Sequence, residues 1–563
     1  MTWPRPVPTV GDPSSAAERR ADPTGWALGA DVVAALHEVV AARRDVRRFR
    51  PDDVAPELLE QVLAAGHRAP SVGHSQPWRF VVVREQATRD RAAGLADRER
   101  LRQAEGLTPD RRARLLDLQL EGIREAPVGV VVACDRRAAA DGVLGRATFP
   151  DTDLWSCACA IQNIWLAARA AGLGLGWVTL FRPIDLAGLL GLPDGVETLG
   201  WLCLGWPDER PPEPGLERRG WSQRVPLADV VLHERWPAAG AAPEPPPSYL
   251  AAPDPAAVVA ARDTGDDLLA APGSLGVLDA TIDRVVALPG ADPVGGTLVL
   301  AAGDHPVAGL GVSAYPASVT ADVLAATAAG ESLAAVTARA AGLRLVARHA
   351  VPTRPQGDLL HADALHPDDV ATLLADGVAL GREAAAHGLV CLGEVGIGNT
   401  TVAAALACAL LDRPAAELVG LGAGADTAMV RRKTEVVAGA LDRVGTRAAD
   451  APAAVLAALG GPEFALLTGV VLGAAGAGVP VVLDGLATSV AALLAVRTDA
   501  GVRSALVAGQ RSRERGHAAI LVELGLEPLL DLRLRAGEGV GACLAAQALR
   551  SGLAVRRAAG RTR

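Results

Sequence analysis

The sequence predicts two domains, the first of mixed helices and strands and the second an α/β domain with a parallel sheet covered by helices on both faces. A chain of 563 residues is too long for a single compact core. A stretch dense in proline and alanine lies between Trp236 and Arg262, and all ten tryptophans precede it. This change in composition indicates two halves that pack differently.

The first half alternates helical and strand-like segments. Apolar residues at helical spacing predict helices at 58–65 and 154–171, the second of them long and buried. Short apolar runs predict strands at 80–83, 128–133 and 201–204.

The second half repeats a strand, a glycine turn and a helix. Strands are predicted at 297–301, before Gly303, and at 479–483, before Asp484, and a helix is predicted after Gly398. Alternation of this kind predicts a Rossmann-like parallel sheet with helices on both faces.

The stretch rich in proline and alanine is interpreted as a semi-rigid spacer, because proline locks the backbone into an extended path. The predicted organisation is a disordered N-terminus at 1–30, a first domain at 31–236, the spacer at 237–262 and a second domain at 263–563.

Composition excludes several classes of function. A formal net charge of -9 gives no reason to expect nucleic-acid binding. Seven scattered cysteines, without zinc-site spacing, predict reduced, mostly buried thiols in a cytoplasmic protein and no metal site. The N-terminus lacks the apolar core of a secretory signal.

The uncharged stretch 464–483 is as long as a bilayer span, but its glycines and proline favour a buried helix, a turn and a core strand, so no membrane association is expected.

The densest polar cluster of the first half is RRDVRRF at 43–49. Alone, such a cluster is typical of a solvated helix face, on which Asp45 would pair with Arg48. Here it precedes HRAPSVGHSQPWRF at 67–80 and GLGLGWVTLFR at 172–182, with LGR and LCLG also in order. With these motifs the first half resembles the nitroreductase-like flavoproteins, and most closely the dimethylbenzimidazole synthases.

The resemblance implies an α+β flavoprotein fold that takes reduced FMN as a substrate. In that family oxygen adds to the reduced flavin, which is cut up to give 5,6-dimethylbenzimidazole. Asp45 matches the essential aspartate, which would move protons beside the ribityl chain. Thr179 stands where the family has a serine.

The implied flavin contacts divide by chemistry. Guanidinium groups would bind the phosphate through charge-assisted hydrogen bonds, and these are Arg43, Arg44 and Arg47, with Arg182 as a weaker candidate. The ring would lie against the turn at Pro70 and Ser71, while Gln76 has the donor and acceptor that a pyrimidine edge needs.

The strongest signal of the second half is GEVGIGNTT at 393–401, after an apolar run. A strand, a glycine turn and a helix expose backbone N–H groups and the positive end of a helix dipole, which together bind phosphate. A plain structural turn is the alternative for this segment alone. The lysine of a P-loop is absent.

The other segments of the second half occur in an ordered set. They are PGSLGVLD at 272–279, AAGDHPVAGLGVSAYPASVT at 301–320, VGLGAGADTAMVRRK at 419–433 and LLDLRLRAGEGVGACLA at 529–545. From about 272 to the end, the chain resembles the nicotinate-nucleotide–dimethylbenzimidazole phosphoribosyltransferases. That family transfers phosphoribose from nicotinate mononucleotide to the benzimidazole nitrogen.

The resemblance implies a role for several residues. Glu538 matches the general base that deprotonates the acceptor. The ribose phosphate would be held by Glu394, Gly396, Gly398, Asn399, Thr400 and Lys433. Asp304 and His305 would border the base pocket. Pro306, Gln510 and Ala536 depart from the residues usual in the family.

The two resemblances support each other, because the product of the first reaction is the acceptor of the second. They imply small-molecule substrates, a separate flavin reductase and a homodimer. Three alternatives stay open. The first half is an ordinary FMN-dependent nitroreductase, the second half is a degenerate binding module, or the transferase acts on another acceptor.

Overall fold

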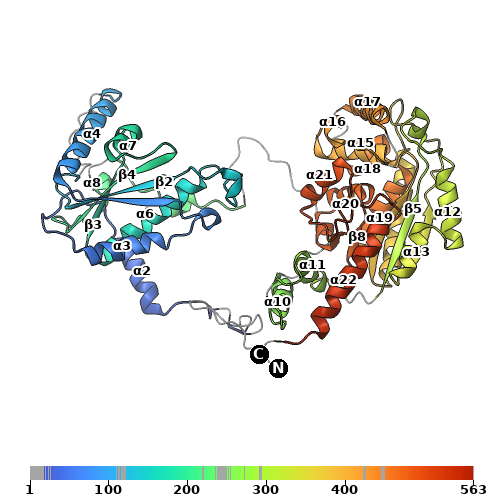
Figure 1. Ribbon diagram of the computed structural model, residues 1–563, viewed down its shortest axis with the longest axis horizontal. Helices are drawn as coiled ribbons and strands as arrows, with labels where there is room; N and C mark the ends of the chain where they lie inside the picture. The colour runs from blue at the N-terminus through green and yellow to red at the C-terminus, as the bar shows by residue number, and fades with distance from the viewer. Residues whose placement is uncertain are drawn as a thin grey trace. The chain divides into compact units, whose positions relative to one another are not determined.

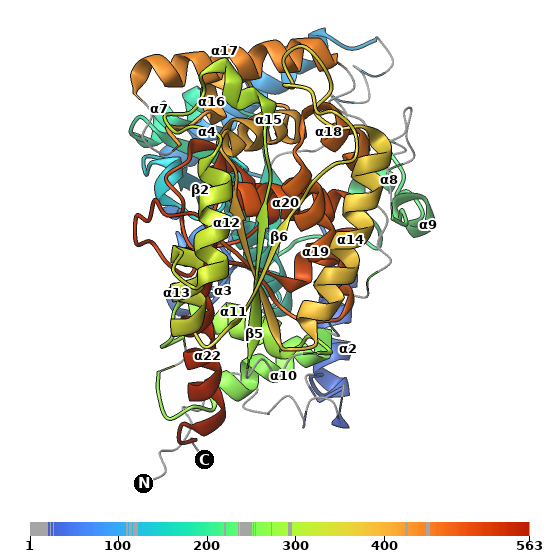
Figure 2. The same cartoon turned by 90° about the vertical axis from the view of Figure 1, so that its right-hand side faces the viewer.

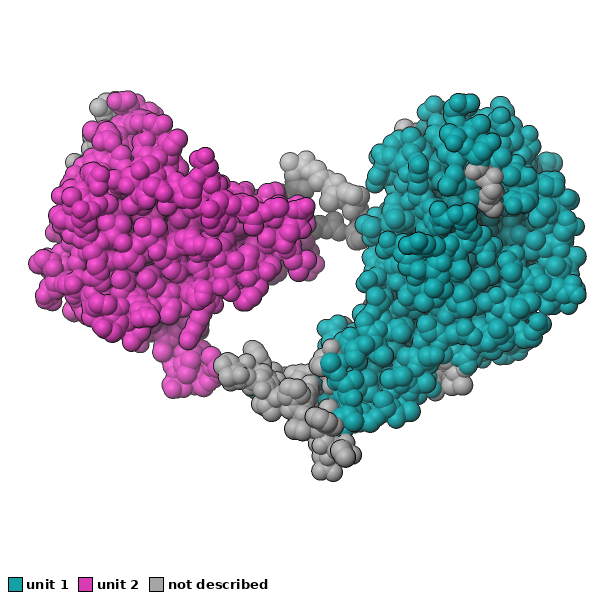
Figure 3. Space-filling view, viewed as in Figure 1, with its two compact units in different colours: residues 1–26, 242–563 teal, residues 27–241 magenta. Residues whose placement is uncertain are grey.

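The computed structural model describes residues 18, 21–22, 24–25, 27–108, 111, 115, 122–218, 221–234, 236, 250, 253, 255–271, 273–290, 295–422, 426–445 and 451–561. The chain divides into two compact units, residues 27–241 and residues 242–563 with 1–26 (Figures 1 and 3). Most of the predicted disordered N-terminus and of the predicted spacer lies outside the described residues.

The first unit is built on a four-stranded antiparallel sheet in the order β1-β2-β4-β3. The strands are β1 (Trp78–Val83), β2 (Val128–Asp135), β3 (Gly174–Val178) and β4 (Val196–Gly205). The three predicted strands correspond to β1, β2 and β4.

Helices cover both faces of this sheet. The helical elements of the unit are α2 (Ala30–Ala42), α3 (Pro56–His67), η1 (Val72–His74), α4 (Gln86–Glu105), η2 (Ala140–Gly142), α6 (Thr152–Ala170), α7 (Pro183–Leu190), α8 (Gly215–Arg218) and α9 (Leu227–Val230). Val130 and Val132 of β2 pack toward α3 and α6. Val131, between them, packs toward α4 and α7, because successive strand residues point to opposite faces. The α+β prediction and both predicted helices are confirmed.

The second unit is built on a five-stranded parallel sheet in the order β6-β5-β7-β8-β9. The strands are β5 (Gly296–Ala302), β6 (Arg344–His349), β7 (Leu389–Val395), β8 (Val481–Leu483) and β9 (Leu506–Ala508). The predicted parallel sheet is confirmed.

Two apolar layers cover this sheet. The helical elements are α10 (Pro255–Asp266), α11 (Val277–Val286), η3 (Pro306–Leu310), α12 (Val319–Ala329), α13 (Leu333–Ala340), α14 (Pro367–Ala385), α15 (Asn399–Leu411), α16 (Ala415–Leu418), α17 (Thr427–Val444), α18 (Pro452–Leu459), α19 (Pro462–Gly476), α20 (Leu486–Thr498), η5 (Ala500–Ala505), α21 (Arg515–Leu524) and α22 (Val540–Ala558). Val299 of β5 packs with the layer of α14, α15, α19 and α20, whereas Leu298 packs with that of α11, α13 and α22.

Part of the predicted spacer is helical. Residues 255–262 belong to α10, and Ala261 in it is buried. Proline is tolerated at the first helical position and alanine is the best helix former, so this composition continues as a helix where it can pack. The predicted extended path over these residues is wrong.

The uncharged stretch 464–483 forms the buried helix α19, a turn and the core strand β8, as predicted. Of the described residues, Val319–Ala340 is long and apolar enough to cross a membrane by length and composition. It comprises α12 and α13, which are separated at Gly330 in the left-handed conformation. Six of the seven cysteines are buried and Cys159 is exposed.

Helices α14 and α19 are in backbone contact (Figure 2). A methyl group at Gly377 or Gly381 of α14 would overlap a carbonyl oxygen of α19, and one at Gly469 or Gly473 of α19 would overlap a carbonyl oxygen of α14. Two pairs of glycines, each four residues apart, therefore set the distance between these helices.

We predict that Gly377→Ala lowers the free energy of unfolding of the second unit by about 1–3 kcal/mol, because the added methyl has no space. Calorimetry of the full chain measures this. Gly188→Ala in α7, where nothing lies within 4 Å, is the control. It should change the stability of the first unit by less than about 1 kcal/mol. Equal effects of the two substitutions would contradict the packing argument.

Candidate functional site

The carboxyl ends of β5, β7, β8 and β9 meet at one edge of the parallel sheet, where the loops carry the polar residues of the second unit. After β7, Gly398 takes φ 97° and begins α15, whose first turn holds Asn399 and Thr400. Asn399 donates from Nδ2 to Glu394 Oε2 near the end of β7. Thus the predicted phosphate turn is a strand, a left-handed glycine and a helix N-terminus.

Lys433 of α17 lies beside this turn. Its Nζ is 3.0 Å from Thr400 Oγ1 and 3.5 Å from the carbonyl oxygen of Leu421, and the residue is 4% exposed. Burial lowers the pKa of Lys433, and Glu514 opposes this effect. No carboxylate within the described part of the chain lies within ion-pair distance of Lys433. A buried ammonium beside a helix N-terminus is therefore suited to an anionic ligand.

Two polar residues follow β5, and they differ in environment. Asp304 Oδ2 is 3.0 Å from His349 Nε2 in an exposed pair. His305 is buried, and its Nε2 lies 2.8 Å from Glu463 Oε1 at the start of α19. The second oxygen of Glu463 is buried without a hydrogen-bond partner in the described part of the structure. A histidine–carboxylate pair thus lies at the edge where β5 ends.

The predicted base stands in a left-handed loop. Gly537, Glu538 and Gly539 have φ of 66°, 57° and 79°. Glu538 Oε2 accepts a hydrogen bond of 3.2 Å from the N–H of Ala334. The loop lies against β7, because a methyl group at Gly393 would be 2.7 Å from the carbonyl carbon of Glu538. Burial raises the pKa of Glu538, and the Ala334 N–H opposes this.

Two further carboxyl groups lie at this edge, Glu394 half-buried and Asp484 buried. Burial raises the pKa of Glu394 to about 8, and repulsion from Glu463 and Asp484 adds to the effect. Burial raises the pKa of Asp484 to about 7, although backbone N–H groups at the start of α22 lower it. Crowded carboxyls of this kind hold protons at neutral pH. The arrangement is able to accept and to hold protons near a phosphate-binding turn.

The sequence reasoning missed three residues of this edge, namely Glu463, Asp484 and Glu514. Asp484 directly follows the apolar run of β8, and a polar residue at the carboxyl end of a buried strand was an available signal. Glu463 begins an almost wholly apolar helix, where a carboxylate needs a partner. Glu514 accepts from the N–H of Gly422 over a separation of 92 residues, which no local pattern reveals.

In the first unit, the arginine segment leaves α2 at Arg43 and runs beside β3 instead of forming a helix face. Val46 donates its N–H to the carbonyl of Leu175, and Asp45 forms a bridge with Leu175. Glu209 also holds the segment, because its Oε1 accepts hydrogen bonds from the N–H groups of Arg47 and Arg48. The solvated-helix interpretation is therefore wrong.

Asp45 pairs with Arg47, not with Arg48. Its Oδ2 is 2.6 Å from Arg47 Nη2, and its Oδ1 accepts a hydrogen bond of 3.2 Å from the N–H of Trp177. Arg47 also donates to the carbonyl of Trp177 at 3.1 Å. Thr179 follows two residues later and is exposed. The segment thus brings Asp45 and Arg47 beside the end of β3, close to Thr179 in the chain.

The three predicted phosphate arginines differ in what they contact. The Arg43 guanidinium lies 4.5 Å over the ring of Trp165, and no hydrogen bond to its side chain is found in the described part of the chain. Arg44 donates to the carbonyls of Ala41, Arg43 and Pro212. Its guanidinium therefore holds the end of α2 in place, and Arg43 offers more free donors.

The predicted ring-binding turn lies near the other end of α6. Val72 donates its N–H to Ser156 Oγ at 3.1 Å, and Ser71 Oγ accepts the N–H of Gln76 at 3.1 Å. Pro70 precedes this turn and is exposed. Ser156 and Trp165 are nine residues apart on α6, or about 13 Å along its axis. An elongated ligand along α6 would therefore reach both groups.

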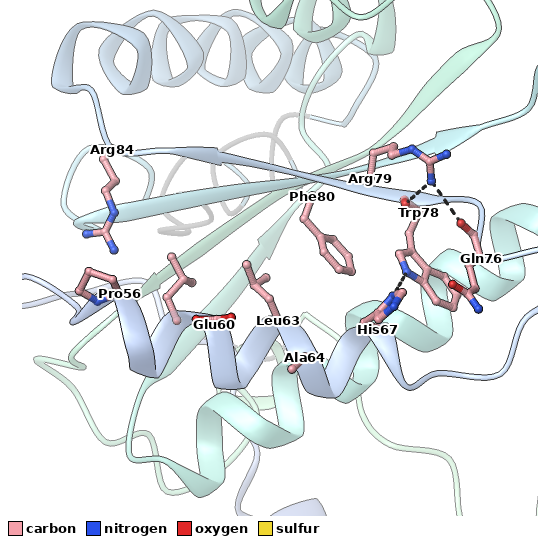
Figure 4. Close-up of a pocket in the computed structure, with 11 residues that line it drawn as sticks. Pro56, Glu60, Leu63, Ala64, His67, Gln76, Trp78, Arg79, Phe80 and Arg84 are labelled. Atoms are coloured by element: carbon pink, nitrogen blue, oxygen red, sulfur yellow. Dashed lines mark hydrogen bonds between the residues drawn. The ribbon is translucent and has the colours of Figure 1, made fainter.

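A cavity of about 710 Å³ lies between α3 and β1 (Figure 4). Its walls are mainly apolar, with Leu63 and Phe80 in the middle, and Gln76 stands at one end with Trp78 and His67. Among the predicted flavin contacts, Gln76 alone lines this cavity. Arg182 stands elsewhere, at the N-terminus of α7, and its Nε is 3.9 Å from Asp185 Oδ2.

Comparisons with known proteins agree with this division. Residues 40–206 match the model of the nitroreductase family, and residues 250–561 match a family model described as a phosphoribosyltransferase. The 5,6-dimethylbenzimidazole synthase of Rhodospirillum rubrum is 44% identical over 186 residues, which cover 33% of this chain and 87% of the relative.

The second half has similar relatives of its own. The nicotinate-nucleotide–dimethylbenzimidazole phosphoribosyltransferase of Xanthomonas axonopodis pv. citri is 39% identical over 327 residues, which cover 54% of this chain and 93% of the relative. A crystal structure of the enzyme of that name from Thermus thermophilus aligns with a TM-score of 0.51 and 36% identity, and covers 55% of this chain and 97% of its own.

The raised pKa values of Glu394 and Asp484 predict a pH dependence of stability. In the folded unit Glu394 keeps its proton up to about pH 8 and Asp484 up to about pH 7. In the unfolded chain they lose their protons near the ordinary pKa values of 4.5 and 3.8, respectively. The folded state binds more protons in this window, so its stability is greatest at low pH and falls as pH rises, by about 1.4 kcal/mol per pH unit for each group.

We predict that Glu394→Gln removes part of this slope, because the amide does not titrate. Urea unfolding of the second unit at pH 5, 6, 7 and 8 measures it. The substitution of an exposed acid, Glu527→Gln, is the control and should leave the slope unchanged. Parallel slopes for Glu394→Gln and the unaltered chain would show that Glu394 is ionised throughout.

Proposed function

Because the chain belongs to the nitroreductase family over residues 40–206 and to the phosphoribosyltransferase family over residues 250–561, we propose that it catalyses two consecutive steps in the synthesis of the cobalamin lower ligand. The first unit converts reduced FMN and molecular oxygen into 5,6-dimethylbenzimidazole. The second unit transfers phosphoribose from nicotinate mononucleotide to that base and releases nicotinate. The names of the two relatives, each covered over most of its length, support this pairing.

The residues of the first unit fit FMN as a substrate. A phosphate needs cationic donors, and we assign it to Arg43 and Arg47, with Arg44 holding the segment and Arg182 as a further contact. The support is the Arg43 guanidinium, which stacks on Trp165 and keeps its donors available. The ring is assigned to the turn at Pro70, Ser71 and Gln76, near the other end of α6.

Asp45 is the proposed proton carrier of the first reaction. Its carboxylate is held by Arg47 and by the N–H of Trp177, and it remains partly exposed. A carboxylate fixed beside the phosphate-binding segment is placed to move protons at the ribityl chain. Thr179 supplies the hydroxyl that the family has on a serine.

One observation carries the second reaction, namely the buried ammonium of Lys433 beside the turn at Gly396–Thr400. We assign the phosphoribose to this turn, with Glu394 and Asn399 holding it from the end of β7. Asp304 and His305 border the base pocket after β5. The bond from ribose C1′ to the nicotinate nitrogen breaks, and nicotinate leaves with the electron pair.

Glu538 is the proposed general base of the transfer. As the benzimidazole nitrogen forms its bond to ribose C1′, its partner N–H must lose a proton, and the Glu538 carboxylate takes it. Burial that raises the pKa of Glu538 makes the carboxylate more basic, which suits this role.

We infer in addition a separate flavin reductase, which supplies reduced FMN, and a cytoplasmic homodimer. Support for assembly comes from α2, which exposes Val32, Leu36 and Val40 at a spacing of four residues, a face that a second copy would cover.

We predict that the purified chain, supplied with reduced FMN, oxygen and nicotinate mononucleotide, forms ribosylated dimethylbenzimidazole phosphate, identified by mass spectrometry. Asp45→Asn should lower dimethylbenzimidazole formation by at least about 100-fold and leave transfer to added dimethylbenzimidazole intact. Glu538→Gln should let free dimethylbenzimidazole accumulate, because its formation continues while transfer falls by at least about 100-fold.

Matched controls are available for both substitutions. Asp52 pairs with Arg50 at 2.9 Å, two residues away, as Asp45 pairs with Arg47, so Asp52→Asn controls for loss of an ion pair. Glu527→Gln controls for loss of an acid before the Glu538 loop. Reoxidation of the flavin without fragmentation would contradict the first reaction, and added dimethylbenzimidazole left unribosylated would contradict the second.

We predict that Lys433→Met raises the KM for nicotinate mononucleotide by about 10- to 100-fold, the effect of one hydrogen bond to a charged group. The KM for dimethylbenzimidazole should change little. Steady-state kinetics with each substrate varied in turn measure both. Arg431→Met, two residues away and exposed on the same helix, is the control. An unchanged KM for the nucleotide would exclude Lys433 from its binding.

A further inference from the structure

The loop that carries Glu538 needs an external constraint. Glu538 has φ 57°, in a region that residues with a side chain seldom adopt, and both neighbours are left-handed glycines. Glycines add freedom and do not fix a conformation by themselves. The hydrogen bonds that hold this loop therefore decide where the Glu538 carboxylate stands.

Asp484 makes two of these hydrogen bonds. Its Oδ2 accepts the N–H of Gly539 at 3.3 Å, and its Oδ1 accepts the N–H of Ala542 at 3.1 Å. Gly539 is the residue that precedes α22, so the carboxylate binds the N-terminus of that helix, where N–H groups lack partners within the helix. Asp484 thus ties the end of β8 to the residue that directly follows Glu538.

Asp484 is itself held rigidly. It is 3% exposed, and its own N–H donates to Thr488 Oγ1 at 2.9 Å. Gln510, after β9, packs against Gly541 from the other side, with its Oε1 buried and unpartnered in the described structure. A carboxylate fixed in this way at the end of β8 holds the Glu538 loop in a defined position relative to the sheet.

The titratable groups that face Asp484 are Glu538 from the loop and Glu394 and Cys391 from β7. Burial, and to a smaller extent repulsion from Glu538, raises the pKa of Asp484, whereas burial alone raises the pKa of Glu538 and the Ala334 N–H lowers it. Asp484 therefore acts on Glu538 through the backbone hydrogen bonds and not through charge.

We propose that Asp484 is a positioning residue of the phosphoribosyl transfer, which fixes the backbone that directly follows the proton acceptor Glu538. This inference rests on the proposed function of the second unit. Asp484 acts through Glu538 and is not assigned a contact with either substrate.

Asp484→Asn tests the proposal. The amide offers one acceptor oxygen, so it serves the N–H of Gly539 or that of Ala542 but not both. We expect kcat for transfer to fall by about 10- to 100-fold, because the base is misplaced. The KM for nicotinate mononucleotide should change by less than about threefold, since its phosphate is held at Lys433. The acidic limb of the pH profile of kcat should stay where it is, because Asp484 holds the Glu538 loop through backbone hydrogen bonds and not through charge.

Two further variants separate the position of the loop from the general loss of a buried carboxylate. Asp499→Asn removes another buried carboxylate that accepts two backbone N–H groups, those of Leu250 and Gly501, and should leave kcat and its pH profile unchanged. Gly539→Ala places a side chain at φ 79° without altering charge. It should lower kcat and leave the acidic limb where it is.

Hydrogen–deuterium exchange gives a readout that does not need activity. In Asp484→Asn the amides of residues 537–542 should exchange faster, while those at the C-terminal end of α22 stay protected. Unchanged exchange in this segment, or an unchanged kcat, would overturn the proposal. Absence of transfer in the unaltered chain would instead overturn the proposed function, and the exchange result would still show whether Asp484 holds the loop.

Discussion

Four carboxyl groups, Glu394, Glu463, Asp484 and Glu538, lie at the same edge of the second unit. Parallel strands bring Glu394 and Asp484 there, because their carboxyl ends meet at one side of a sheet, and the start of α19 and the loop before α22 add Glu463 and Glu538. Burying them together is unfavourable unless each has a partner or a proton. Glu463 has His305, Glu394 has Asn399, Asp484 has the N-terminus of α22 and Glu538 has the N–H of Ala334. The loops around the edge are arranged to provide these partners, so the crowding of acids determines their course.

The first unit also holds a carboxyl group at its candidate site, but it does so on an extended segment. Its candidate site is not at the end of a strand but on an extended segment, which lies beside β3 through the Val46 hydrogen bond. Here Asp45 is paired with the Arg47 guanidinium, and the backbone is fixed by Glu209. In the second unit Glu394 and Asp484 have no cationic partner of this kind among the described residues, and burial raises the pKa of both. The two units therefore hold their carboxyl groups in different ways, one with an ion pair and the other with neutral hydrogen-bond donors.

Sequence reasoning was sufficient where the signal is local. The strands β1, β2, β4, β5, β7 and β8 coincide with apolar runs in the sequence, and the turn at Gly398 follows from a strand, glycines and an alanine-rich helix in succession. Sequence reasoning failed where contacts between residues far apart in the chain determine the structure. Asp484 accepts a hydrogen bond from the N–H of Gly539, 55 residues away, and the Arg44 guanidinium donates one to the carbonyl of Pro212, 168 residues away. Neither contact leaves a pattern in the nearby sequence. Residues 255–262 look like a spacer by composition and become helical because α11 and α22 offer a surface.

In the proposed function, the second site divides into a rigid side and an adjustable side. The proposed phosphate side consists of a helix N-terminus and a buried lysine, both in regular helices, which leaves little room for variation. The proposed acceptor side depends on the left-handed loop at 537–539, whose course is set by side chains that follow β8 and β9 instead of by regular structure. Gln510 and Ala536, which depart from the family pattern, both lie on this side. Changes in acceptor preference are therefore expected from residues that hold the loop, while the donor is retained.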